Sequence, residues 1–405
     1  VDGNVTIVIV AAILMGAFGP TDGFWAKVFN PIFFWFGPST AGTVYSFGFT
    51  LLTSVLLNFV FGVWATRVMI RGAVHFKPLR KAWLFGGKKE GGADFKTPSI
   101  NFIGNRKKFY TFSCALIAIV LVFCGIFGVK MDVEFKGGSM VTLSYEGEAD
   151  LNALKSTIST ELNKSNLTLQ TGSDISGSQT LTVTLPGSET LTTEQMNSLL
   201  TTLNEQYPAN NFVQNEVNNV DATIGKEFLL KSIVALIAAC VLILLYVAYR
   251  FRKIGGLKAG STAIVALLHD MFVVFGVFVI LRIPLNGNFI AALLTILGYS
   301  INDTVVIYDR IRENSALYSK KQMGLAELVN LSINQSFARS LMTSITTCLA
   351  LGVVCVISVI YRLDSIYSFA FPLLFGMVSG VYSTICIATP LWVDWKSKKK
   401  AAKKA

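Results

Sequence analysis

The chain has 405 residues, of which 52% are hydrophobic and only 15% are charged, and its mean hydropathy is +0.56. Soluble domains carry about 25% charged residues, so this composition excludes a soluble enzyme of this size. Several apolar stretches approach the roughly 20 residues that a helix needs to cross a bilayer. The sequence therefore predicts a polytopic α-helical membrane protein.

Eight apolar segments are expected to span the membrane. In chain order they cover residues 4–19, 44–66, 110–128, 228–249, 260–282, 287–308, 341–361 and 366–393. An even number of spans places both ends of the chain on the same side of the membrane.

The distribution of basic residues sets the orientation. Residues 66–109 hold eleven Lys and Arg against two acids, residues 250–258 hold four and no acid, and six lysines follow Trp395. The positive-inside rule places these segments in the cytoplasm. The net charge of +11 therefore indicates topology and contact with anionic lipids, rather than binding of nucleic acid.

The chain carries no pattern typical of an enzyme or a metal site. All six cysteines lie inside apolar runs, no CxxC pair occurs, and there are only two histidines. A structural zinc site or a disulfide framework is therefore not expected. Since a nucleophile–base pair and a phosphate loop are also missing from the sequence, we expect no catalytic residue and no cofactor.

One polar domain lies between the third and fourth spans. Residues 129–225 hold twelve acids and four lysines, which places them on the extracytoplasmic side. Alternation predicts strands and 3.6-residue periodicity predicts helices, in the order strand–helix–strand–strand–helix–strand. The segments assigned are strands at 140–145, 181–185 and 212–220 and helices at 150–162 and 192–203. This order predicts a small α+β, ferredoxin-like module that binds or couples rather than catalyses.

An aromatic insert separates the first two spans. Residues 20–42 contain Phe24-Trp25 and the run 32–36, bracketed by three prolines. The run is too short to cross a bilayer, and Trp and Phe favour its boundary. We expect a short interfacial or re-entrant segment.

The chain contains an internal repeat. Residues 44–52 (VYSFGFTLL) match residues 366–374 (IYSFAFPLL). This register sets residues 1–72 against 337–395, as the last two helices of two similar halves. Many transporters are built from two such halves, with the working site at their interface.

Polar residues are concentrated in residues 298–314. A charged group inside a span is costly and by default marks a pathway. At about 1.5 Å per residue, Asp303 lies roughly 9 Å deeper than Asp309, and Ser300 shares its helix face. Because burial disfavours the charged form of a carboxylate, Asp303 suits a group that loads and releases a proton. A purely structural partner for an arginine is the alternative.

Four further positions are candidates. Arg339 opens the next span below Thr343 and Thr347 and is either part of a polar path or an anchor at the helix end. His269-Asp270 in the fifth span is either a proton relay or a satisfied pair that bridges helices. Asp2 either caps the first helix or has a role in the pathway, because the repeat register sets it opposite Arg339.

These residues also carry a family resemblance. The segment 298–314, with Gly-Tyr-Ser-Ile-Asn-Asp at 298–303, resembles the signature of SecF, the membrane subunit of the SecD–SecF protein-export factor. Further stretches agree with it: 131–138, 220–227, His269-Asp270 and 339–347. Residues 1–72 resemble the last two spans of SecD, with an Asp-x-Asn-Val-Thr motif at 2–6. The chain thus resembles the C-terminal part of a fused SecD–SecF chain.

The resemblance implies an accessory of the Sec translocase in the bacterial plasma membrane. It implies an RND-superfamily factor driven by the proton motive force, with Asp303 and Arg339 in the proton path beside Asn302 and Ser300. The implied partners are the N-terminal half of SecD, the SecYEG translocon and unfolded polypeptide in transit, with protons as the coupling ion. The family's second relay aspartate and its head domain are not in this chain, and Glu134 replaces the aspartate of an Asp-Phe-x-Gly-Gly motif.

The predicted organisation follows from these segments. It comprises two SecD-like spans (1–72), a basic cytoplasmic linker (73–109), the first SecF-like span (110–128), the extracytoplasmic α+β domain (129–225), five SecF-like spans (226–395) and a basic cytoplasmic tail (396–405). Two other functions stay open: a passive assembly subunit of the translocon, and an RND-type permease for a lipid or small molecule.

Overall fold

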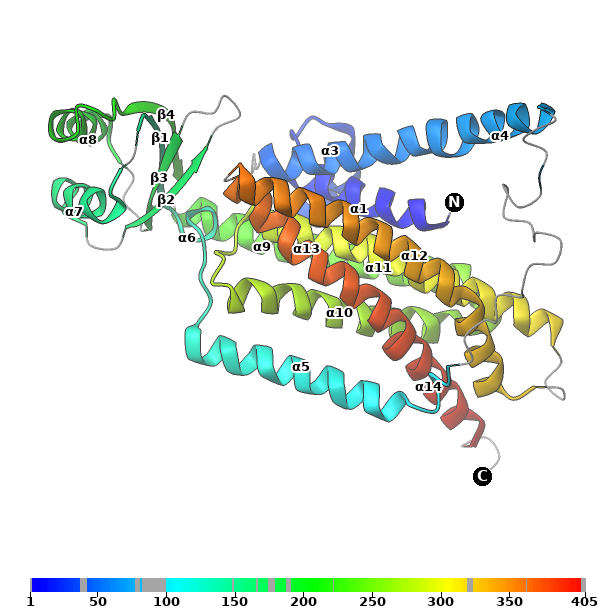
Figure 1. Cartoon of the computed structure of the whole chain (residues 1–405). Coiled ribbons are helices and arrows are strands. Elements are labelled where there is room, and N and C mark those ends of the chain that lie inside the picture. Colours follow the sequence, from blue (N-terminus) through cyan, green and yellow to red (C-terminus); the bar gives the residue numbers. More distant parts are fainter. Residues whose placement is uncertain are drawn as a thin grey trace.

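A computed structural model of the chain shows a bundle of long helices with a small sheet domain at one end (Figure 1). It describes residues 2–36, 42–76, 81, 100–147, 149–164, 167–173, 179–186, 191–220, 222–318, 323–361 and 363–401. Most of the predicted basic linker and the last residues of the tail lie outside this range.

Seven helices in the described residues are long and apolar enough to cross a membrane. They are formed by α3 (Gly42–Leu57) with a π-helical turn η1 (Asn58–Ala65) and α4 (Thr66–His75), α5 (Arg106–Phe127), α9 (Ala222–Arg250), α10 (Gly256–Ile280), α11 (Gly287–Leu317), α12 (Leu325–Ile360), and α13 (Asp364–Ser383) with a π-helical turn η5 (Thr384–Ala388) and α14 (Thr389–Ala401). The predicted first span forms α1 (Asp2–Phe18), which is also apolar but only 17 residues long. The eight predicted spans are therefore seven helices of spanning length and one shorter helix.

Two of the helices are much longer than predicted. The span predicted at 341–361 belongs to α12, which begins at Leu325, and α11 continues to Leu317. A helix of 36 residues reaches about 54 Å, whereas the hydrocarbon core is about 30 Å thick. Hydropathy marks only the part that lies in lipid, while backbone hydrogen bonding carries the helix on into the polar region.

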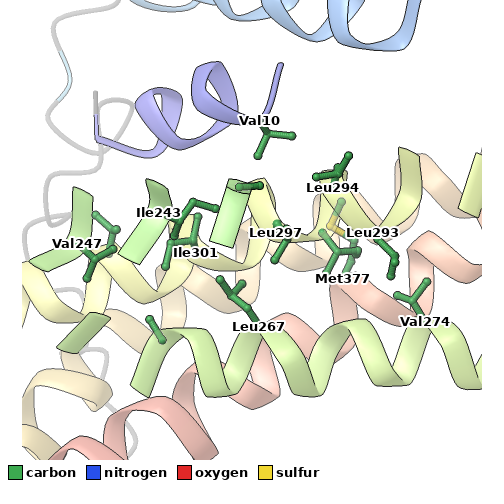
Figure 2. Packing of buried hydrophobic residues seen from close by; sticks show 14 of the residues in the cluster. Val10, Ile243, Val247, Leu267, Val274, Leu293, Leu294, Leu297, Ile301 and Met377 are labelled. Atoms are coloured by element: carbon green, nitrogen blue, oxygen red, sulfur yellow. The ribbon is translucent and has the colours of Figure 1, made fainter. Parts of the chain in front are cut away.

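Helix α11 forms the centre of the bundle. In the most apolar stretch of α11, 78% of the residues are buried, against 11% in that of α5. Figure 2 shows Leu297 of α11 among side chains from its neighbours, with Val10 from α1, Ile243 from α9, Leu267 from α10 and Met377 from α13. The helix that carries the predicted site is thus enclosed by helices rather than lipid.

The polar domain has the predicted ferredoxin-like order. It contains β1 (Gly138–Tyr145), α7 (Leu151–Glu161), β2 (Thr168–Ser173), β3 (Gln179–Pro186), α8 (Thr193–Gln206) and β4 (Val213–Val220). The strands are antiparallel in the order β2-β3-β1-β4, and both helices cover one face of the sheet (Figure 1). Alternate residues such as Val141, Leu143, Leu181 and Val183 are fully buried under them. The prediction of a small α+β domain is confirmed.

The aromatic insert forms a short helix, α2 (Phe24–Phe33). Its ten residues reach about 15 Å, half the thickness of the hydrocarbon core. Phe33 is buried and a side chain at Gly16 of α1 would collide with Phe29, so α2 packs closely on α1. Phe24 and Trp35 are largely exposed. The structure agrees with a segment that does not span the membrane; residues 37–41 of the insert lie outside the described range.

Candidate functional site

Two buried carboxyl groups lie in the helical core, and they differ in their hydrogen bonding. Asp270 on α10 is 0% exposed and Asp303 on α11 is 3% exposed. Both were predicted as polar residues inside spans. Their surroundings indicate two different roles.

Asp270 is saturated with hydrogen bonds. Ser300 of α11 and Ser383 of α13 donate to its Oδ2 at 2.7 Å each, and Ser379 of α13 donates to its Oδ1 at 2.6 Å. His269 Nδ1 lies 3.3 Å from Oδ1. A buried carboxylate costs several kcal/mol unless such donors satisfy it. Asp270 therefore ties three helices together.

The sequence did not single out Ser379 and Ser383. They are four residues apart and therefore lie on one face of the helix. Two small hydroxyl residues at this spacing in an apolar span were the sequence signal that could have indicated a shared hydrogen-bond acceptor. Ser300 was predicted to share a helix face with Asp303. In the structure its hydroxyl donates to Asp270, because the α10 carboxylate is the acceptor in reach.

Asp303 is buried without a matching set of donors. Its Oδ2 has no hydrogen-bond partner, and among the described residues no hydrogen bond to its carboxyl group is found. Arg339 of α12 interacts with it electrostatically, although no ion pair within 4.0 Å joins these two described residues. Asn302 beside it is half-buried and Arg339 is exposed. A carboxyl oxygen left unpartnered in a bundle core can accept a proton.

The hydroxyl residues of α12 bind Tyr299 of α11. The Tyr299 hydroxyl lies 3.2 Å from Thr347 Oγ1 and 3.4 Å from Ser344 Oγ. Thr343 instead donates to the Arg339 carbonyl at 2.9 Å and is exposed. Tyr299, which was not singled out from the sequence, thus joins the face of α11 next to Asp303 to the predicted polar face of α12.

The predicted residues His269 and Asp2 lie apart from the contact between Tyr299 and α12. His269 is buried, and its Nε2 is among the described polar atoms that have no partner. Asp2 belongs to the first turn of α1, but its side chain lies outside the described residues. In the described ranges no three His, Cys, Asp or Glu side chains gather in a metal-binding group.

Comparison with known proteins assigns the chain to a family. Residues 198–398 match the family model described as "Protein export membrane protein SecD/SecF, C-terminal". The chain is 35% identical to the protein translocase subunit SecF of Alicyclobacillus acidocaldarius, over 76% of this chain and 96% of that protein. It is 28% identical to the protein translocase subunit SecDF of Bacillus subtilis, over 98% of this chain and 50% of that protein.

Solved structures agree with these relatives. The fold is similar to the crystal structure of SecDF, a translocon-associated membrane protein, from Thermus thermophilus, with a TM-score of 0.71 and 26% identity over 98% of this chain and 48% of that one. It is also similar to SecDF in a super-membrane-facing form, with a TM-score of 0.63 and 28% identity over 100% and 49% of the two chains. The chain spans about half the length of the SecDF proteins it matches. It belongs to the SecD/SecF family of protein export membrane proteins, whose members are named as subunits of the protein translocase.

Proposed function

We propose that the chain is the membrane-embedded part of a factor that uses the proton motive force to promote protein export through the Sec translocon. Protons move inward past Asp303, and the change in protonation alters the packing of α11. The sheet domain on the outer side and the other half of the factor follow this change and act on the polypeptide in transit.

The contrast between the two buried carboxyl groups is the observation that supports a proton-handling role. A carboxylate that only held helices together would be expected to collect donors, as Asp270 does with three serines. Asp303 keeps an unpartnered oxygen. It also interacts electrostatically with the guanidinium group of Arg339 on α12. Charges of this kind inside a span mark ion pathways.

The proposed orientation rests on charge. The basic segments near residues 66–109 and 250–258 and the lysine tail lie in the cytoplasm under the positive-inside rule, where they contact anionic lipids. The sheet domain then faces outward, on the side where polypeptide emerges from SecYEG. The SecD-like N-terminal half completes the site, because α1 and α3 supply only two of its helices.

The test is pulse-chase export of a secreted precursor in cells whose only copy of the factor is the full-length parent carrying Asp303→Asn. Asparagine preserves shape and hydrogen bonding but cannot titrate. We expect precursor to accumulate while the protein is made and inserted normally. Glu313→Gln, an exposed change near the end of the same helix, is the matched control and is expected to leave export unchanged. Normal export in Asp303→Asn cells would favour a passive assembly subunit.

A further inference from the structure

A short connector joins the sheet domain to the helical bundle. It contains α6 (Val133–Lys136), which lies between α5 and β1. Just before α6, the Asp132 N–H donates to the Leu285 carbonyl and the Leu285 N–H donates to the Lys130 carbonyl, both at 2.9 Å. Leu285 belongs to the loop that leads into α11. The connector and this loop therefore pair like two short strands.

Glu134 of the connector contacts α11 itself. The N–H of Gly287, the first residue of α11, donates to Glu134 Oε2 at 2.6 Å. The first N–H groups of a helix have no partner within the helix, and the helix dipole favours an acidic group there. The side chain of Asn286 accepts the N–H of Phe289, so Glu134 takes a donor that the N-cap residue leaves free. α11 is the helix that carries Asp303.

The other side of α6 packs on α9. Phe135 is buried, and its ring lies 5.3 Å from that of Phe228, which in turn lies 5.3 Å from Phe18 of α1. A side chain at Gly225 would come within 3.1 Å of the Glu134 carbonyl oxygen. α6 is therefore packed against α9 on one side and hydrogen-bonded to the start of α11 on the other.

The connector passes directly into the centre of the sheet. Gly137 and Gly138 have φ values of 80° and 137°, which glycine adopts without strain, and β1 begins at Gly138. A side chain at Gly138 would collide with the Leu185 carbonyl oxygen of β3. Since β1 pairs with both β3 and β4, a displacement of α6 is passed to the middle of the sheet.

We infer that Glu134 is a positioning residue that couples the sheet domain to α11, so that a shift of α11 around Asp303 moves β1. This inference rests on the proposed proton-driven function. It assigns Glu134 to coupling and not to proton transfer, because its carboxyl group binds the first N–H of α11 at Gly287, about 24 Å along the helix from Asp303. Losing the contact is expected to separate proton movement from export.

The experiment compares Glu134→Ala with Asp303→Asn in the full-length parent protein. Proton flux is followed in inverted membrane vesicles with a pH-sensitive dye, and export is followed by pulse-chase. For Glu134→Ala we expect export to fall to the level of Asp303→Asn while proton flux stays at the parent level. Glu134→Gln keeps an oxygen that accepts the Gly287 N–H and is expected to restore export. Glu227→Ala, which changes an exposed glutamate in the first turns of α9, is the matched control.

A second variant removes the donor instead of the acceptor. Gly287→Pro deletes the N–H at the first helical position, where proline is tolerated, and Asn286 before it is already extended, as a residue before proline prefers. It is expected to reproduce the uncoupling, and it replaces Glu134→Ala if that variant fails to accumulate.

Three results would overturn the inference. Normal export in Glu134→Ala and Gly287→Pro cells, with Asp303→Asn inactive, would remove the coupling role alone. A parallel loss of flux and export would make Glu134 a structural cap. Normal flux and export in Asp303→Asn would remove the proton-driven function and the coupling with it.

Discussion

Phe47 and Phe369 occupy equivalent positions of the internal repeat, and their rings meet edge to face with centroids 5.5 Å apart. The pair belongs to α3 and α13, which the repeat register also makes equivalent. A cavity of about 190 Å³ lies beside it, lined by a second equivalent pair, Val44 and Ile366, and by Gly287 and Asn288 of α11. The two halves of the repeat therefore meet at the end of α11 that Glu134 caps.

The aromatic contact is expected to stabilise this interface. An edge-to-face pair contributes about 0.5–1.5 kcal/mol beyond the burial of its area. A double-mutant cycle of Phe47→Ala and Phe369→Ala, measured by unfolding in detergent micelles, should give a coupling free energy in this range. Phe61→Ala in place of Phe47→Ala is the control, since Phe61 is 65% exposed and should show no coupling. Additive effects of the Phe47 and Phe369 changes would contradict the contact.

The hydroxyl groups around Asp270 give a second prediction. Ser383→Ala removes one donor and is expected to lower the free energy of unfolding by about 0.6–1.7 kcal/mol, as for other interhelical bonds in membranes. Asp270→Ala leaves three buried hydroxyls without their acceptor and is expected to cost about 2–4 kcal/mol. Unfolding of the purified protein in detergent measures both. Equal costs for the two variants would mean that the serines find other partners without loss.

The stability of the connector around α6 should depend on pH. Burial raises the pKa of Asp132 above its ordinary 3.8, although the N–H groups of Val133 and Glu134 oppose the shift. Burial also raises the pKa of Glu134 above its ordinary 4.5, against the effect of the Gly287 N–H. The folded connector thus holds protons that the unfolded chain has released. Its stability is greatest below the ordinary pKa values and falls as the pH rises through the raised ones.

Hydrogen exchange of the amides at residues 130–137 tests this dependence. After correction for the intrinsic exchange rate, protection should decrease as the pH rises above the ordinary values of 3.8 and 4.5 and through the raised pKa values of the two groups. Asp132→Asn removes one titrating group and should flatten the profile, while its amide oxygen can still cap α6. Protection that increases over this range would show that the carboxylates, and not their neutral forms, stabilise the connector.

Two asparagines one turn apart on α12 hold the end of the basic linker. Asn334 Oδ1 accepts the Ile100 N–H at 3.1 Å, Asn330 Oδ1 accepts the Phe102 N–H at 2.9 Å, and both side-chain amides donate to the Ile100 carbonyl. The double variant Asn330→Ala/Asn334→Ala should release this segment, because each unpaired backbone group costs about 1–3 kcal/mol.

Limited proteolysis of membrane vesicles measures the release. Cleavage near residues 100–105 should become faster in the double variant. Glu327→Ala, an exposed change on the same helix, should leave the cleavage rate unchanged. An unchanged rate in the double variant would show that packing of Phe102 against Phe337 is sufficient to hold the segment.

The amino-acid sequence by itself determined the class of the protein, its spans and the order of the sheet domain. These features depend on local patterns. A bilayer requires a run of about 20 apolar residues, and strands and helices have fixed periods. The position of Asp303 relative to Asp309 also followed from counting residues along one helix. Helix ends were less accurate, since α12 begins 16 residues before its apolar segment.

The tertiary structure alone decided which polar groups meet. Gly287 and Glu134 are 153 residues apart and Asp270 and Ser383 are 113 residues apart, and no periodicity within a span relates such positions. The rotation of each helix about its axis, set by side-chain packing, turns Ser300 toward Asp270 and leaves an oxygen of Asp303 without a partner. The sequence places both carboxyl groups within apolar helices, and only the packing of the helices separates the one whose hydrogen bonds are satisfied from the one with an unpartnered oxygen.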